Sequence, residues 1–110
     1  MTEVFKSKLS TTRAGERTRI WVEGTRLASH GFTCGLRFSR KWTPATLTLT
    51  LISQKQFDEL PIAERGTVSG KGTKPIIDVT GAKVAETFGV GTHVAVNYAH
   101  GVITIKRTEV

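Results

Sequence analysis

The reactive or ligand-binding side chains that dominate this chain are its lysines and arginines. The sequence has 16 Lys and Arg against 9 Asp and Glu, a formal net charge of +7 and a pI near 10.1. The excess is concentrated in residues 1–41, where basic side chains far outnumber acidic ones. Clustered positive charge attracts polyanions, because each phosphate that is neutralised releases a counterion. This clustering predicts a surface that binds nucleic acid.

Arginine is suited to such a surface, because its planar guanidinium bonds phosphate oxygens or a guanine edge in pairs. The candidate nucleic-acid contacts are Arg13, Arg17, Arg19, Arg26, Arg37, Arg40, Lys41, Lys71, Lys74 and Lys83. Arg37 and Arg40 are three apart, so an ideal strand does not present both on one face. Trp42 is either a platform on which an unpaired base stacks or a partly buried aromatic at a strand end.

Catalysis and metal binding find little support in the residue pattern. The three histidines, at positions 30, 93 and 100, lack the spacing of metal ligands, and the carboxylates form no distinctive pair. Cys34 is the single cysteine, which excludes an internal disulfide and favours a small buried hydrophobe. We therefore expect a protein that is not an enzyme and that holds neither metal nor cofactor.

The glycine-rich stretch at residues 66–74 is the nearest approach to a phosphate-binding loop. It is not a P-loop, because the four-residue gap and the Ser or Thr after Gly-Lys are missing. Lys71 and Lys74 could contact backbone phosphate. The favoured interpretation is a flexible linker between two halves of the chain.

Alternating and β-branched patterns dominate the rest of the chain, with residues 46–51 the clearest half-buried strand. Strands are also expected over residues 17–22, 36–40, 76–79, 92–98 and 102–106, and short helices over residues 24–30 and 81–88. Residues 42–44 should break a strand, residues 53–65 could hold a helical turn, and residues 99–101 should close a hairpin. The first 15 residues are predicted to be a polar arm that could pair as a strand at its start and then loosen.

The two halves of the chain look alike, each with a strand, a glycine, a short helix, a Phe-x-x-Gly turn and a hairpin. The matched positions are Gly24, Leu27, Phe32 and Gly35 in the first half and Gly81, Val84, Phe88 and Gly91 in the second. A unit of this size exposes an apolar face that a second unit could bury. We expect one mainly β domain over residues 1–110, a small barrel or sandwich built from units 17–52 and 74–107 joined by residues 53–73.

This order resembles the swapped-hairpin AbrB/SpoVT family of DNA-binding regulators, and its SymE-like branch most closely. The resemblance is carried by Ile20, Trp21, Gly24, Leu27, Gly31, Phe32, Gly35 and Leu36, and by Ile76, Ile77, Gly81, Val84, Phe88, Gly91 and Val94. It implies DNA contacts from Arg17, Arg19 and Arg26, with Lys74 and Lys83 in the second copy. The family's proline after the first strand is absent here, with Glu23 and Thr80 near that place.

The family normally builds its barrel from two chains, so the resemblance implies either a monomer with an internal barrel or a homodimer. The N-terminal stretch also looks like small accessory proteins of phages and mobile elements. We expect a cytoplasmic DNA-binding regulator or antitoxin-like protein, with DNA favoured over RNA. The alternative is a phage-type inhibitor or accessory protein that binds an acidic surface of a protein partner. No apolar run is long enough to span a membrane.

Overall fold

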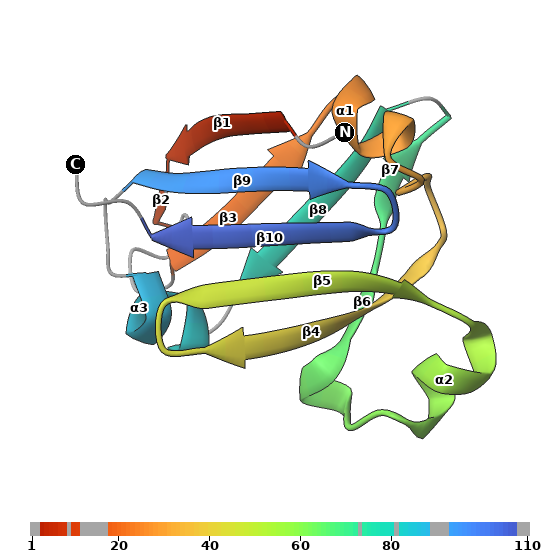
Figure 1. Cartoon of the computed structure of the whole chain (residues 1–110). Coiled ribbons are helices and arrows are strands. Elements are labelled where there is room, and N and C mark those ends of the chain that lie inside the picture. Colours follow the sequence, from red (N-terminus) through yellow and green to blue (C-terminus); the bar gives the residue numbers. More distant parts are fainter. Residues whose placement is uncertain are drawn as a thin grey trace.

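Two antiparallel sheets packed face to face make up this protein in a computed structural model (Figure 1), which describes residues 3–8, 10–11, 18–72, 74–80, 82–88 and 93–107. The six-stranded sheet has the order β1 (Glu3–Lys8), β9 (His93–Ala99), β10 (Val102–Arg107), β5 (Thr46–Ile52), β4 (Arg37–Thr43) and β6 (Arg65–Thr67). The four-stranded sheet has the order β2 (Ser10–Thr11), β3 (Thr18–Glu23), β8 (Lys74–Thr80) and β7 (Ser69–Lys71). The expected mainly β fold is confirmed, as two sheets and not a closed barrel.

The helices are short: α1 (Thr25–Ser29), α2 (Gln54–Glu59), the 3-10 turn η1 (Ile62–Glu64) and α3 (Ala82–Phe88). Among the described residues, no helix has the length and apolar character needed to cross a membrane.

Strand β5 shows how the sequence pattern sets the two faces of a sheet. Its residues alternate Thr and Leu, and Leu47 and Leu49 are completely buried while Thr46, Thr48 and Thr50 keep partial exposure. The expected break at residues 42–44 is wrong in its position. Strand β4 continues to Thr43, which pairs with Thr46, so Pro44 lies in the hairpin turn, where it needs no ladder hydrogen bond.

The two repeated units pair strand against equivalent strand. The order β3-α1-β4-β5 recurs as β8-α3-β9-β10, and β3 pairs with β8 while β5 pairs with β10. The flanking pairs Arg19·Thr80 and Glu23·Ile76 lie symmetrically about Trp21·Asp78, and Thr46·Lys106 and Thr50·Val102 lie symmetrically about Thr48·Thr104. A pseudo-two-fold axis therefore passes through the centre of both sheets.

Each unit completes its core only with the other. Helix α1 packs on β8 as well as on β3, and α3 packs on β3 as well as on β8. The equivalent residues Leu27 and Val84, and Phe32 and Phe88, are all completely buried. Because these side chains close one core from both units, neither unit would bury its apolar face alone.

The segment between the units is ordered over its described residues, so the interpretation as a flexible linker is wrong there. Ser53 and Gln56 form a capping box at the start of α2, and Val68 is buried between β6 and β7. Gly70 has φ of 107°, and a Cβ there would meet the main-chain carbonyl of Lys74. Glycine is thus required for the tight β7–β8 hairpin, not for flexibility.

Candidate nucleic-acid interface

The outer face of the six-stranded sheet carries positive charge without negative charge at its described positions. We define the basic sheet face by the residues of β4, β5, β9 and β10 that alternate with the core residues. They are Arg37, Ser39, Lys41, Thr43, Thr46, Thr48, Thr50, Ile52, Ala95, Asn97, Ala99, Val102, Thr104 and Lys106. This face points toward the viewer in Figure 1. Three of its residues are cationic, and none of the positions named is Asp or Glu.

Register places the cations among hydroxyl groups. Lys106 lies across from Thr46, and Lys41 lies across from Thr48, whose other neighbour is Thr104. Lys41 and Lys106 are two strands and two residues apart, which separates their backbone positions by roughly 12 Å. Lysine ammonium and threonine hydroxyl groups both donate to phosphate oxygens. The basic sheet face therefore has the donors to bind a sugar-phosphate backbone.

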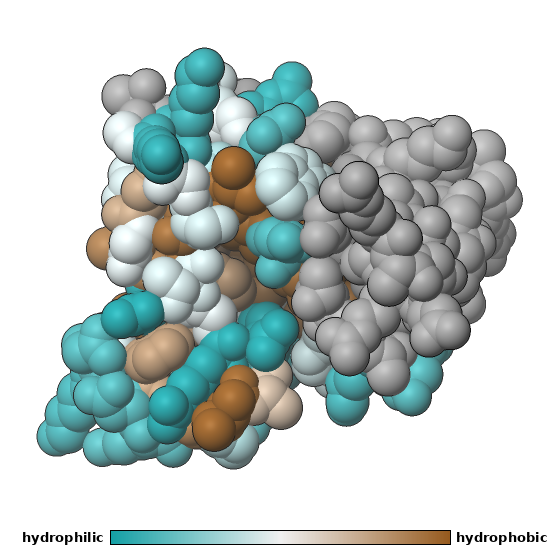
Figure 2. Space-filling model, turned by 180° about the vertical axis from the view of Figure 1, so that it is seen from behind, coloured by the Kyte–Doolittle hydropathy of each residue, from teal (hydrophilic) through white to brown (hydrophobic). Residues whose placement is uncertain are grey.

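The outer face of the four-stranded sheet has a different character. Glu23 and Asp78 lie on it beside Trp21, which is 38% exposed, and Ile76. Figure 2, which shows the molecule from behind, has apolar and polar surface mixed on this side. The carboxylates would repel phosphate, so the two outer faces of the molecule are not equivalent.

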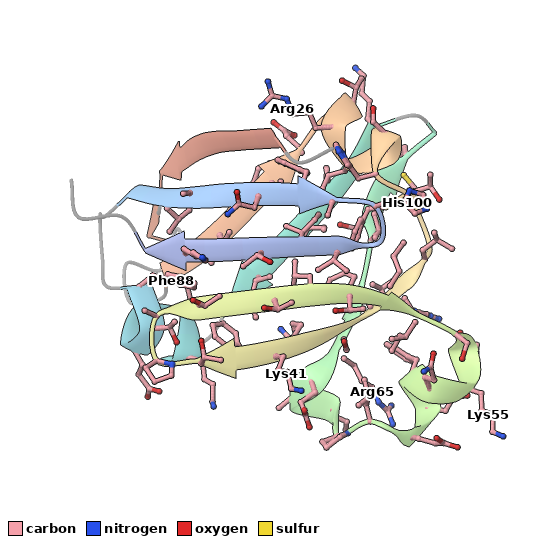
Figure 3. All side chains as sticks on the ribbon, in the orientation of Figure 1. Arg26, Lys41, Lys55, Arg65, Phe88 and His100 are labelled. Carbon is pink, nitrogen blue, oxygen red and sulfur yellow. The ribbon has the colours of Figure 1, made fainter. Side chains whose placement is uncertain are left out.

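The structure divides the predicted contacts into separate groups. Lys41 is exposed on the basic sheet face (Figure 3). Arg26, Lys71 and Lys74 are exposed around α1 and the β7–β8 hairpin, where α1 packs on β8 and Lys71 pairs with Lys74. Lys83 is exposed on α3. These groups lie on other elements than Lys41 and outside the basic sheet face.

The predicted arginine contacts between residues 13 and 26 are only partly described. Arg13 and Arg17 lie outside the described residues, and Arg19 is placed by its backbone in β3, opposite Thr80 and Ser10. Arg26 lies on α1, with its backbone carbonyl accepting a 2.7 Å hydrogen bond from His30 Nδ1.

Arg37 lies on the basic sheet face, but its guanidinium is engaged within the protein. Its Nε donates to Gln54 Oε1 at 3.1 Å and its Nη1 donates to Thr67 Oγ1 at 2.6 Å. The guanidinium also lies 4.6 Å from the ring centre of Phe57, which Arg65 approaches at 5.2 Å. Arg37 therefore fixes α2 against β4 and β6. Fewer of its N–H donors remain available to a ligand.

Arg40 faces the opposite way from the predicted surface. It pairs with Leu49 in the row of core residues and lies on the same face of β4 as Phe38 and Trp42. Its Nε is buried and has no hydrogen-bond partner among the described residues. Desolvation by this burial lowers the pKa of Arg40 below its ordinary value. The prediction that Arg40 joins the exposed basic patch is thus wrong. Side chains alternate along a strand, so Arg40 and the outward-facing Lys41 point to opposite faces of β4.

Replacing Arg40 tests this placement. We expect Arg40→Met to raise the free energy of unfolding by up to about 1 kcal/mol, because an unpartnered buried donor is removed while part of the side chain stays in solvent. Arginine stays charged at ordinary pH, so the gain should be the same from pH 5 to 8. Lys41→Met, at the neighbouring outward position, should give no such gain. Chemical denaturation of both variants measures this, and a loss of stability in Arg40→Met would contradict it.

Lys106 is a further candidate contact, outside the set predicted from the sequence. The alternation of Ile103 and Ile105 with Thr104 and Lys106 places Lys106 on the face opposite the core, and it is exposed. Trp42 instead packs inward, with its ring centre 6.4 Å from that of Phe88. That contact favours the interpretation of Trp42 as a partly buried strand aromatic.

Groups that could act in catalysis have structural contacts in the described part of the chain. The His30 ring lies 5.4 Å from that of Tyr98, and Cys34 Sγ donates to the carbonyl of Gly72 at 3.5 Å. Within the described residues, no group of three or more His, Cys, Asp or Glu side chains could hold a metal ion.

No known protein family, curated protein or solved structure matches this chain. The similarity to the AbrB/SpoVT family stays a prediction.

Proposed function

We propose that this protein binds nucleic acid through the basic sheet face, as a DNA-binding regulator or antitoxin-like protein. The observation that carries the proposal is the placement of Lys41 and Lys106 among threonine hydroxyls, with no carboxylate at the described positions of that face. Such a surface binds by charge and by hydroxyl donors, both of which suit the phosphate backbone.

The pseudo-two-fold axis supports a double helix as the ligand. It emerges on the basic sheet face at Thr48·Thr104. The two antiparallel strands of a duplex are also related by two-fold axes, whereas a single strand has none. A sheet centred on such an axis can present equivalent main-chain positions to both backbones, although the equivalents of Lys41 and Lys106 are the uncharged Asn97 and Thr50.

The aromatic residues of the six-stranded sheet support the same choice. Phe38, Trp42 and Tyr98 all lie on the side of the core. Proteins that hold single strands stack bases on exposed aromatic rings, and no described position of the basic sheet face has one. The higher charge density of a duplex then favours it over a single strand.

A salt series of fluorescence-anisotropy titrations tests the proposal. We expect a 20-base-pair DNA duplex to bind at low salt, with the logarithm of the binding constant falling linearly against the logarithm of the salt concentration. Duplex RNA and single strands of the same sequence, titrated in parallel, measure the preference. Absence of binding by all of them at low salt would overturn the proposal.

A further inference from the structure

Part of the edge of the six-stranded sheet has no neighbouring strand. Strand β4 pairs with β5 along its whole length, but on its other side β6 covers only residues 37–39. Among the described residues, no strand pairs with residues 40–43 on that side. In Figure 1 this part of β4, toward its arrowhead, is the lower border of the sheet. Turn η1 precedes β6 and packs against β4, so an added strand must lie beyond this turn or displace it to pair with the main-chain N–H and C=O groups of residues 40–43.

The side chains at this edge favour one kind of strand. Arg40 points into the space between the sheets, and its buried Nε has no partner among the described residues. Lys41, the next residue, is exposed on the other side of the strand. A strand laid beside them would meet positive charge on both of its faces. A carboxylate on that strand would supply the acceptor that Arg40 lacks.

An apolar contact is also available beside the edge. Turn η1 packs against β4 and carries Ile62, which is 81% exposed, the most exposed of the large hydrophobic side chains described. Ile62 could contact an apolar side chain of an added strand.

We propose that residues 40–43 of β4 form a docking edge for an extended protein segment in which acidic and β-branched residues alternate. The segment adds a strand beside β4, as in other cases of β-strand addition, and places a carboxylate on Arg40. This edge includes Lys41 of the basic sheet face, so a bound protein segment and a nucleic acid would both approach that residue. The proposal does not depend on nucleic-acid binding.

A synthetic twelve-residue peptide that alternates Val or Thr with Glu is a suitable probe, and the same peptide with Lys in place of Glu is its control. In NMR spectra of the ¹⁵N-labelled full chain, we expect the acidic peptide to shift the amide signals of residues 40–43 and to slow their hydrogen exchange. The Lys peptide should do neither, because its charges repel Arg40 and Lys41.

Two variants separate strand addition from general attraction between opposite charges. Arg40→Met should weaken binding of the acidic peptide about tenfold, since the substitution removes the partner of a carboxylate. Lys106→Met, which removes a charge away from this edge, should leave the affinity within about twofold. The proposal is overturned if millimolar peptide leaves the amides of residues 40–43 unchanged, or if the two variants weaken binding equally.

Discussion

Reversing the charge of Lys41 and Lys106 together should weaken duplex binding by roughly tenfold or more at low salt. Both side chains lie on the basic sheet face, and each is expected to neutralise a phosphate. Loss of two such contacts should also make the slope of log binding constant against log salt less steep by about two. Anisotropy titrations of Lys41→Glu/Lys106→Glu at several salt concentrations measure both effects.

A matched double variant controls for net charge. Lys55 is exposed on α2 and Lys83 is exposed on α3, and neither belongs to the basic sheet face. Lys55→Glu/Lys83→Glu changes the net charge by the same amount, so it should cause only the modest loss due to the overall field. Equal losses in the two double variants would mean that the basic sheet face does not contact the nucleic acid. Unchanged unfolding midpoints would show that both variants are folded.

Gly66→Ala should destabilise the fold by about 2–3 kcal/mol, which lowers the unfolding temperature by roughly 10–20 °C. Gly66 in β6 lies opposite Phe38 in β4, and a Cβ at position 66 would overlap the Phe38 ring. Phe38 is 2% exposed, and its ring centre lies 6.3 Å from that of Phe32. The ring therefore has no open space into which to move. Thermal unfolding followed by circular dichroism measures the loss.

A double-mutant cycle identifies the cause of that loss. Phe38→Leu removes the ring at a cost of its own, because it leaves space in the core. If the overlap with the ring is the cause, Gly66→Ala should cost clearly less in the Phe38→Leu background than in the natural protein. An equal cost in both backgrounds would trace the effect to the main chain of β6 and contradict the overlap.

Local pattern was enough to locate most of the described elements. Alternation in residues 46–51 gave β5, and the hairpin of residues 92–106 appears as β9 and β10. The expected helices correspond to α1 and α3. These predictions succeed because side-chain periodicity and turn chemistry are properties of a few neighbouring residues. The predicted end of β4 is too early because pairing of Trp42 and Thr43 with β5 outweighs the local signal of Pro44.

The sequence by itself determined the charge, the mainly β class and the repeated order of strand, helix and hairpin. Only the tertiary structure decided that equivalent strands pair, that two sheets form without closing into a barrel, and which cations share a face. Lys41 and Lys106 are far apart in the chain, and they share the basic sheet face because the β4–β5 and β5–β10 registers align them. Arg40 adjoins Lys41 yet points to the core side. Register between distant strands depends on the packing of the whole core, which no short stretch of sequence encodes.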